Sequence, residues 1–512
     1  MNLALAFASS AEKNASRTAL CWGDQTYSYE LFLGQTRQVA AHLQQHLQVR
    51  PGDRVGLWLK NCPEFVPALF GTLMAGAVVV PINNFLKPDE VNYILADAGV
   101  DVVITDATLA EALPKLSAAR PQLKFYLVEE VGQASRLPAG RLARESSNDG
   151  IAITGETPAP LSERCESDLA VLIYTSGTTG RAKGAMLSHG NLLANVESCR
   201  QVLSAVKDDR FVVLLPMFHS FMLCVGVLLP LLVGGSMVLI KSVHPAKNVL
   251  LDILQHQATI LPAIPQFFRT LASASLPKDF PLRLCISGGA PLPREVLREF
   301  NEKFPMLPLI EGYGLSEASP VVTLNPLAGP WRAGSIGLPI PGVEVTVQND
   351  AGECLPVGQI GEISVRGANV MLGYWNQPEE TAKALRNGWL LTGDIGYKDA
   401  DGYFYITDRK KDMLLVNGIN VYPREIEEII YKFPGVKEAA VIGVPDSRKG
   451  EHPLAFVSGK EGFLLDEKSL LQFVREKLAD YKVPRKIVFM PALPRNATGK
   501  ILKTSLRQQA HP

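Results

Sequence analysis

Residues 174–184 (YTSGTTGRAKG) combine glycines, hydroxyls and two cations in a spacing that suits an anion. The segment follows a predicted strand (LAVLIY) and precedes a predicted helix that begins around Ser188. Glycines let backbone N–H groups converge on an anion, the hydroxyls add hydrogen-bond donors, and Lys183 adds positive charge. The pattern therefore predicts a phosphate-binding loop, with a flexible surface turn as the alternative. It differs from a Walker A loop, because Ala182 and not glycine precedes Lys183.

Two acidic residues farther along the chain have side chains that could bind parts of a nucleotide. Glu317, in GYGLSE, is a hard oxygen ligand suited to Mg²⁺, and Tyr313 in the same motif offers a flat face for a purine. The alternative is an ordinary turn with a solvated glutamate. Asp394 stands in TGDIG, where glycines indicate a turn, and its carboxylate can accept hydrogen bonds from ribose hydroxyls. Taken alone, Asp394 is better interpreted as an Asx-turn residue.

These residues need a scaffold, and the sequence predicts an α/β fold. Strands are expected at residues 55–59, 77–82, 101–105 and 125–128, with a helix at 62–74 and helical stretches between the later strands. Strands that alternate with helices favour a mostly parallel sheet. Residues 132–168 have the composition of a surface connection, and the sequence after Gly334 predicts a small β subdomain.

The last hundred residues are expected to form a small α+β domain. Pro423 opens a helix whose apolar residues recur at helical spacing, at Ile426, Ile429, Ile430 and Phe433. Strands are expected at 439–444 and 453–457, and a second helix at 469–479. We therefore expect a large N-terminal domain of mixed parallel sheets with helices over residues 1–410. A small mobile domain over residues 411–512 would be hinged near the charged run at 408–412.

The composition argues against several classes of protein. The 512 residues include 51 Lys and Arg against 51 Asp and Glu, and this balance gives no support to a nucleic-acid-binding protein. Seven cysteines without zinc-type spacing, and an N-terminus without a signal-peptide pattern, indicate a reducing, cytoplasmic location. Residues 211–240 hold no Asp, Glu, Lys or Arg, but prolines and glycines divide them. A buried strand–helix–strand is therefore favoured over a transmembrane span.

Taken together, the motifs resemble those of the adenylate-forming enzymes, which include acyl-CoA synthetases, luciferases and the adenylation domains of peptide synthetases. After the loop at 174–184, the family's motifs follow in order as SGGAPL (287–292), GYGLSE (312–317), GEISVRG (361–367), NGWLLTGDIG (387–396), ITDRKKDMLLVNGINVYPREIE (406–427) and PRNATGKIL (494–502). The resemblance covers residues 31–506, and residues 387–412 look most like the fatty-acyl-CoA synthetases.

The resemblance implies a nucleotide site. It assigns ATP or AMP binding to Thr175, Ser176, Gly177, Thr178, Thr179, Gly180, Lys183, Gly288, Gly289, Ala290, Glu311, Gly312, Tyr313, Gly314, Ser316, Asp394, Arg409 and Lys500. In this assignment Tyr313 stacks on adenine, Asp394 binds ribose, and Arg409 assists at ribose or phosphate. Thr175 and Glu317 hold Mg²⁺. Ser316 stands where the family usually has threonine, and the hydroxyl is kept.

The resemblance also implies how the acid and its acceptor are handled. It names as catalytic residues Lys500, Thr175, Glu317 and His219, and as acyl-pocket residues His219, Ala290 and Gly314. Lys411 takes the family's hinge position, and Gly418 would line the tunnel for coenzyme A (CoA). Taken from the sequence alone, a core histidine is an equal interpretation of His219.

The implied function is an ATP-dependent ligase that activates a carboxylic acid as acyl-AMP and transfers the acyl group to CoA. The apolar residues 218–232 could line an acyl tunnel, so a medium- or long-chain fatty acid is expected. An aryl acid, a carrier protein as acceptor and a non-catalytic nucleotide sensor are the alternatives. The expected cofactors and co-substrates are ATP, Mg²⁺ and CoA. Peripheral membrane contact and a homodimer stay open.

Overall fold

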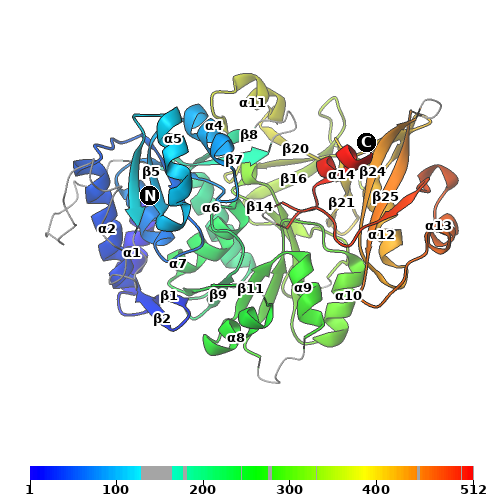
Figure 1. Cartoon of the computed structure of the whole chain (residues 1–512), viewed down its shortest axis with the longest axis horizontal. Helices are drawn as coiled ribbons and strands as arrows, with labels where there is room; N and C mark the ends of the chain where they lie inside the picture. Colours follow the sequence, from blue (N-terminus) through cyan, green and yellow to red (C-terminus); the bar gives the residue numbers. More distant parts are fainter. Residues whose placement is uncertain are drawn as a thin grey trace. The chain divides into compact units, whose positions relative to one another are not determined.

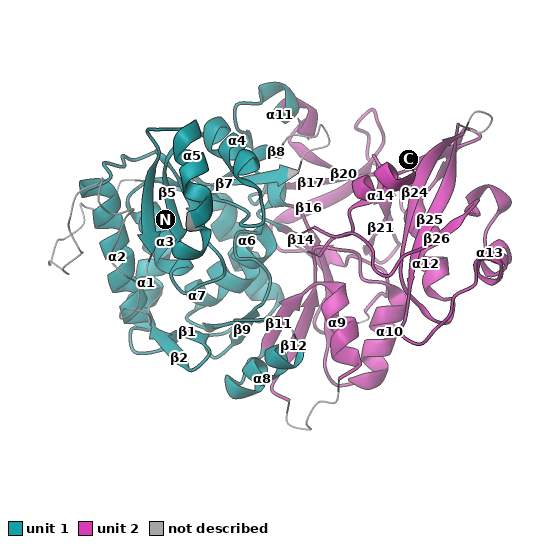
Figure 2. Ribbon diagram, in the orientation of Figure 1, with its two compact units in different colours: residues 1–259, 316–320, 368–381 teal, residues 260–315, 321–367, 382–512 magenta. Residues whose placement is uncertain are grey.

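The computed structural model describes residues 1–128, 164–176, 182–243, 245–274, 280–329, 331–446, 450–496 and 499–510 (Figure 1). Most of the predicted surface connection at 132–168 lies outside these residues. The chain forms two compact units (Figure 2). Unit 1 comprises residues 1–259, 316–320 and 368–381, and unit 2 comprises residues 260–315, 321–367 and 382–512. The predicted domain boundary at residue 410 falls inside unit 2. That residues 411–512 move as a separate domain stays a prediction.

Unit 1 contains a seven-stranded sheet in the order β18-β8-β7-β4-β3-β5-β6. Its strands are β3 (Arg54–Trp58), β4 (Val78–Pro81), β5 (Val100–Asp106), β6 (Lys124–Val128), β7 (Leu169–Ser176), β8 (Ala182–Ser188) and β18 (Gly373–Tyr374). The pairs from β7 to β6 are parallel, whereas β8 runs antiparallel to both β7 and β18. The four early strands were expected from the sequence, with bounds that differ by one residue.

Helices connect these strands in the alternation that the sequence predicted. They are α3 (Phe65–Met74), α4 (Pro88–Ala98), the 3₁₀ helix η1 (Ala107–Ala112) and α5 (Leu113–Ala119). Figure 1 shows α4 and α5 side by side over β5. Buried Leu95 of α4 belongs to the same core as Val80 and Val103 of the sheet. The mostly parallel α/β arrangement is therefore confirmed.

The remaining part of unit 1 surrounds the strands β1 (Thr18–Trp22), β2 (Gln25–Ser28), β9 (Arg210–Val213) and β10 (Ser236–Leu239). Its helices are α1 (Leu3–Lys13), α2 (Tyr29–Gln45), α6 (His189–Val202), the π-helix η2 (Met222–Leu228), α7 (Leu229–Val233) and α8 (Lys247–Gln255). The uncharged stretch forms β9, η2 with α7, and β10, which confirms the predicted strand–helix–strand. Within the described part of the chain, no helix is long and apolar enough to cross a membrane.

Unit 2 begins with a parallel set of strands, β11 (Ile260–Ala263), β12 (Leu284–Ser287) and β13 (Leu309–Gly314), extended by antiparallel β14 (Val321–Leu324) and β15 (Leu338–Pro339). Helices α9 (Pro265–Ala272) and α10 (Arg294–Lys303) lie side by side (Figure 1). The predicted β subdomain is an antiparallel sheet of β16 (Val343–Gln348), β17 (Gly361–Gly367), β19 (Leu385–Arg386), β20 (Trp389–Lys398) and β21 (Phe404–Arg409). Two short elements lie between these strands in the sequence: η3 (Ser316–Ala318) belongs to unit 1, and so does the first turn of α11 (Pro378–Ala384).

The end of unit 2 is the α+β arrangement that the sequence predicted. It contains β22 (Leu414–Val416), β23 (Ile419–Val421), α12 (Pro423–Tyr431), β24 (Val436–Asp446), β25 (Gly450–Gly459), α13 (Glu467–Arg475), η4 (Asp480–Lys482), β26 (Ile487–Phe489) and α14 (Lys503–Ala510). Ile426 and Ile430 of α12 are fully buried, and each contributes about 2 kcal/mol of hydrophobic stabilisation. Helix α13 begins two residues before the expected position, because the Asp466 carboxylate caps it by accepting from the Ser469 N–H at 2.8 Å.

Candidate functional site

In unit 1, the Glu317 carboxylate lies beside two hydroxyl groups. Thr175, near the end of β7, donates a hydrogen bond to Oε1 of Glu317 at 3.3 Å, and Tyr374 on β18 donates to the same oxygen at 2.9 Å. Within the described residues, no group of three or more His, Cys, Asp or Glu is arranged to hold a metal ion. One carboxylate and one hydroxyl nevertheless fit Mg²⁺, since this ion keeps several waters and takes its other ligands from substrate phosphates. The solvated-turn interpretation of Glu317 does not describe these contacts.

The loop at 177–181, with Gly177, Thr178, Thr179 and Gly180, lies outside the described residues, as does the side chain of Ser176. Its two ends are described. The Tyr174 hydroxyl donates to the Asp97 carboxylate at 2.5 Å, and the Tyr93 hydroxyl donates to the Ala182 carbonyl at 3.1 Å. Tyr93 and Asp97 both belong to α4, so this helix holds the strand that enters the loop and the strand that leaves it.

A strand that the sequence analysis did not predict follows the loop. Residues Ala182–Ser188 form β8, paired antiparallel with β7 so that Thr175 lies opposite Lys183. The helix begins where expected, at His189, because the Ser188 hydroxyl caps α6 by accepting from the Asn191 N–H at 3.0 Å. Along the chain, β8 therefore separates residues 177–181 from the start of α6.

Lys183 is buried and forms an ion pair with Glu380 in the first turn of α11. Its ammonium also lies 5.3 Å from the centroid of the Tyr374 ring. The segment that carries these partners runs beside β8, since the backbone N–H of Trp375 donates to the Gly184 carbonyl at 2.8 Å. Sequence reasoning missed Glu380 and Tyr374 because both are distant from Lys183 along the chain.

His219 lies in the turn between β9 and η2 and is partly exposed. Its Nδ1 accepts from the Phe221 N–H at 3.3 Å. The next residue, Ser220, shares a hydroxyl–hydroxyl hydrogen bond of 2.9 Å with Ser316, so the predicted acyl and phosphate residues of unit 1 are neighbours. Asn61 fixes the start of this turn, donating to the Leu215 carbonyl at 2.8 Å and accepting a backbone hydrogen bond at 2.9 Å.

In unit 2, Asp394 joins the predicted adenosine residues. The Tyr313 hydroxyl donates to its Oδ2 at 2.6 Å, and Arg409 Nε donates to its Oδ1 at 2.9 Å. Asp394 is buried and lies within β20, directly opposite Arg409 on β21. The turn that we expected around Asp394 is therefore wrong. The two flanking glycines have different causes: a Cβ on Gly396 would come within 2.1 Å of the Tyr405 carbonyl oxygen, whereas Gly393 has φ +72°, a conformation that favours glycine.

The Lys500 side chain is exposed and lies in unit 2 within the electrostatic influence of Arg409 and Asp394. Loss of hydration beside other protein atoms, followed by the positive charges of Arg409 and Lys411, lowers the pKa of Lys500 to about 8. Asp394 and Asp412 act in the opposite direction. Just beyond it, α14 is fixed by ion pairs from its basic residues, Lys503 to Glu427 at 2.8 Å and Arg507 to Asp412 at 2.6 Å.

The remaining predicted residues of unit 2 flank β12 and β13. Gly312 and Gly314 lie on β13 with Tyr313, and Gly288, Gly289 and Ala290 follow β12. Glu311 is buried and its Oε1 accepts from the Leu292 N–H at 3.0 Å, while burial raises the pKa of this carboxyl to about 7. Gly289 has φ +76°, a conformation that favours glycine. Gly418, at φ +78°, forms the β22–β23 turn with Asn417, also at positive φ.

The chain is similar to proteins of known family along almost its whole length. Residues 7–375 match the AMP-binding enzyme family, and residues 425–500 match the AMP-binding enzyme C-terminal domain. A long-chain-fatty-acid--CoA ligase of Bacillus subtilis (strain 168) is 37% identical, over 98% of this chain and 93% of the relative. A feruloyl-CoA synthase of an Amycolatopsis species is 38% identical, over 90% of this chain and 89% of the relative.

Solved structures agree with these sequence matches. The crystal structure of ATP-bound MatB from Rhodopseudomonas palustris superposes with a TM-score of 0.89 at 33% identity, covering 99% of both chains. The chain therefore belongs to the family of AMP-binding enzymes, within the adenylate-forming superfamily that its motifs resemble. Inside that superfamily it is one of the acyl-CoA ligases.

Proposed function

We propose that this acyl-CoA ligase activates a medium- or long-chain fatty acid. In the first step the carboxylate attacks the α-phosphate of ATP and forms acyl-AMP and pyrophosphate. In the second step the CoA thiol attacks the mixed anhydride, giving the thioester and AMP. The observation that supports the fatty acid is the 37% identity to a long-chain-fatty-acid--CoA ligase over 98% of this chain.

The residues of unit 1 would bind the phosphates of ATP and the metal ion. Glu317 and Thr175 would hold Mg²⁺, which neutralises phosphate charge when it is bound. The Ser316 hydroxyl would contact the α-phosphate, while the loop glycines and hydroxyls would contact the others. We assign these roles because displacement at phosphorus depends on positioning and charge neutralisation more than on a protein nucleophile.

The residues of unit 2 would bind the adenosine and supply the catalytic cation. Tyr313 would stack on adenine while Asp394 accepts from the ribose hydroxyls, with Arg409 holding the carboxylate. Gly288, Gly289, Ala290, Glu311, Gly312 and Gly314 would shape the surroundings of the base and the acyl group. Protonated Lys500 would stabilise the negative charge that develops between the carboxylate and the α-phosphate.

The second step would require the small C-terminal domain to turn. We propose Lys411 as the hinge between residues 1–410 and 411–512, and Gly418 as a residue of the CoA tunnel in the second orientation. The exposed β22–β23 turn that holds Gly418 suits this role, because a Cβ added there would meet no heavy atom within 4 Å. His219 would border the acyl group and change its orientation between the half-reactions.

The likeness to a feruloyl-CoA synthase, at 38% identity, favours an aryl acid as the second candidate substrate. A panel of fatty acids from six to eighteen carbons, with ferulate and benzoate, would separate the two when AMP release is followed with ATP, Mg²⁺ and CoA. Selective turnover of the aryl acids would overturn the fatty-acid proposal. A carrier protein that replaces CoA with higher kcat/KM would overturn the proposed acceptor.

The role of Lys500 can be tested separately. Lys500→Ala should abolish acid-dependent pyrophosphate exchange while thioester formation from supplied acyl-AMP and CoA is largely kept. Normal pyrophosphate exchange in Lys500→Ala would contradict the assignment. Wild-type protein without any AMP release over the acid panel would instead point to the nucleotide-sensor alternative.

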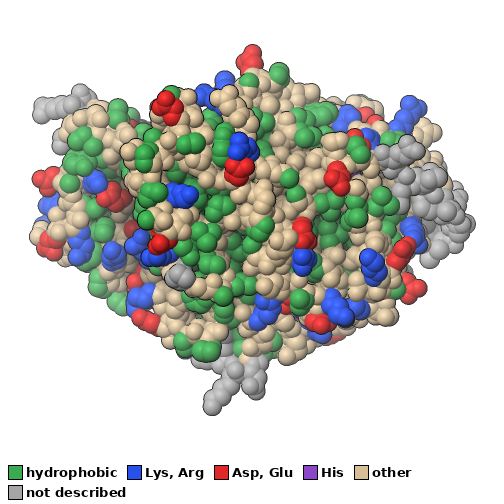
Figure 3. Space-filling model, turned by 180° about the vertical axis from the view of Figure 1, so that it is seen from behind, with side chains coloured by type: hydrophobic (Ala, Val, Ile, Leu, Met, Phe, Trp, Pro, Cys, Tyr) green, Lys and Arg blue, Asp and Glu red, His purple; other side chains and the backbone are tan. Residues whose placement is uncertain are grey.

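We also propose a cytoplasmic location, because all seven cysteines are free thiols. Basic and acidic side chains are interspersed over the face of the molecule in Figure 3, in keeping with the balanced composition. Peripheral membrane contact, to reach lipid substrates, and a homodimer remain hypotheses. Vesicle co-sedimentation and light scattering of the purified protein test them.

A further inference from the structure

Tyr374 makes a contact that the proposed roles leave unused. Its hydroxyl and the hydroxyl of Thr175 both donate to Oε1 of Glu317, at 2.9 and 3.3 Å. Two donors on one oxygen restrict the rotation of the carboxylate and therefore fix the direction in which its other oxygen, Oε2, points. The Glu317 carbonyl is also bound, since it accepts from the Met371 N–H at 2.8 Å, three residues before Tyr374.

Tyr374 is itself held by the ion pair between Lys183 and Glu380. Lys183 is buried, pairs with Glu380, and places its ammonium 5.3 Å from the centroid of the Tyr374 ring. The backbone on either side is fixed as well. The Tyr374 N–H donates to the Thr381 hydroxyl at 2.8 Å, and the Leu372 N–H donates to the Met186 carbonyl at 2.8 Å. The ion pair therefore joins β8 to the segment that presents the Tyr374 hydroxyl.

We propose that Tyr374 is a positioning residue for the metal-binding carboxylate of Glu317, and that Lys183 and Glu380 hold Tyr374 in place. This inference rests on the proposed function to the extent that Glu317 is taken to hold Mg²⁺. Groups that orient a metal ligand through a second hydrogen bond typically change metal affinity 10- to 100-fold when they are removed. It also gives Lys183 a role through Glu380, whereas the sequence motif suggested direct phosphate binding.

Tyr374→Phe tests the first part, because it removes the hydroxyl and keeps the ring over Lys183. Binding of Mn²⁺ in the presence of a non-hydrolysable ATP analogue, followed by the electron paramagnetic resonance of free Mn²⁺, should weaken about 10- to 100-fold. In pyrophosphate exchange, the Mg²⁺ concentration at half-maximal rate should rise by the same factor, and excess Mg²⁺ should restore the rate. Mn²⁺ affinity that matches wild type, or a rate loss that Mg²⁺ does not rescue, would overturn the proposal.

Two further variants serve as controls for this experiment. Tyr405→Phe is the matched control, since it removes a hydroxyl that donates to Asp399 at 3.1 Å in unit 2, and its Mn²⁺ affinity should equal that of wild type. Glu317→Gln separates the inference from the proposed function. If Glu317→Gln binds Mn²⁺ as wild type does, the proposed metal role fails. If it weakens binding and Tyr374→Phe does not, only the positioning role fails.

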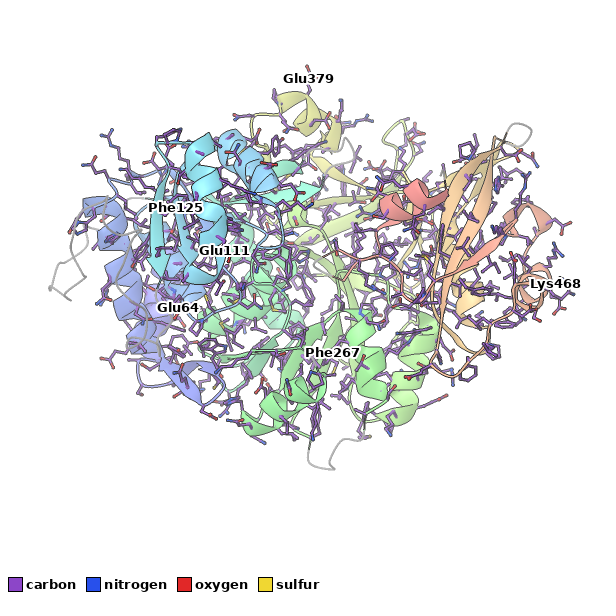
Figure 4. The ribbon with its side chains drawn as sticks, in the orientation of Figure 1. Glu64, Glu111, Phe125, Phe267, Glu379 and Lys468 are labelled. Carbon is purple, nitrogen blue, oxygen red and sulfur yellow. The ribbon has the colours of Figure 1, made fainter. Side chains whose placement is uncertain are left out.

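A double-mutant cycle tests the second part. Lys183→Met and Glu380→Gln should each weaken Mn²⁺ binding, and the double variant should be no weaker than the weaker single variant, because both remove one ion pair. Glu379→Gln is the matched control: Glu379 is exposed and points outward from α11 (Figure 4). An effect of Lys183→Met without any effect of Glu380→Gln would show that Lys183 acts directly on phosphate. Equal effects of Glu379→Gln and Glu380→Gln would refute the ion-pair role.

Discussion

The free enzyme should lose adenylation activity above pH 8 because Lys500 loses its proton. Reduced hydration and the charges of Arg409 and Lys411 lower the pKa of Lys500 to about 8, from a usual value near 10.5. A group with this pKa is about nine-tenths protonated at pH 7 and about one-tenth at pH 9. If protonated Lys500 is required, kcat/KM for ATP should fall about fivefold between pH 8 and pH 9, because kcat/KM follows the titration of the free enzyme.

The assay is acid-dependent pyrophosphate exchange from pH 6.5 to 9.5, at constant ionic strength and at ATP concentrations below and above KM. The decline in kcat should occur at higher pH than the decline in kcat/KM, since the negative charge of bound phosphates favours the protonated amine. An ordinary surface lysine would instead stay almost fully protonated at pH 9.

Two variants decide whether Lys500 is the titrating group. In Lys500→Arg the decline above pH 8 should disappear, whatever rate remains, because a guanidinium stays protonated throughout. Lys503→Arg is the control: Lys503 lies three residues away and pairs with Glu427, so the wild-type decline should persist. A flat wild-type kcat/KM up to pH 9.5, or an unchanged decline in Lys500→Arg, would refute the reasoning.

Three other residues give independent predictions. Burial raises the pKa of Glu311 to about 7, so its carboxyl costs stability as pH rises from about 4.5 through 7. The free energy of unfolding of Glu311→Gln, measured with urea and compared with that of wild type, should therefore be about 3 kcal/mol more favourable at pH 8 than at pH 4.5. An equal difference between variant and wild type at both pH values would contradict this. Burial lowers the pKa of His189 to about 4, so stability of up to about 3 kcal/mol should be lost as pH falls from 6.5 to 4. In His189→Asn the free energy of unfolding should not show this loss between pH 6.5 and pH 4. A loss as large as that of wild type would exclude His189 as its source. Asp394→Asn should weaken ATP binding about 10- to 100-fold by calorimetry, because the amide loses a charged acceptor, and wild-type affinity would argue against ribose binding there.

Local patterns predicted the elements of the fold that depend on nearby residues. The run that forms β3, α3 and β4 alternates strand and helix clearly, and the Ile426 and Ile430 stripe defined α12. Elements that depend on distant pairing were missed. Strand β8 forms because it pairs with β7 on one side and with β18, almost two hundred residues later, on the other. No pattern within residues 182–188 indicates either partner.

The residues of the candidate site show the same difference between local motifs and distant contacts. Motifs identified Glu317, Asp394 and Arg409 by residue type, and the structure adds the partners that orient them. Tyr374 was missed because it lies between the motifs at 361–367 and 387–396, and its own neighbourhood resembles an ordinary glycine turn. Thr175 was identified although its contact with Glu317 spans 142 residues, because Thr175 belongs to the motif at 174–184.

Because the chain has zero net charge, individual cations must compensate the negative charge of ATP. Lys183 is paired with Glu380 and Arg409 with Asp394, so both cations are compensated within the protein. Lys500 differs, because its pKa of about 8 leaves it half protonated at that pH. The negative charge of bound phosphate would raise the pKa of Lys500, so that the amine is fully protonated in the complex. ATP binding should therefore take up about half a proton at pH 8 and almost none at pH 6.5. Calorimetry in two buffers of different ionisation enthalpy measures this uptake, and equal uptake in Lys500→Arg would assign it to another group.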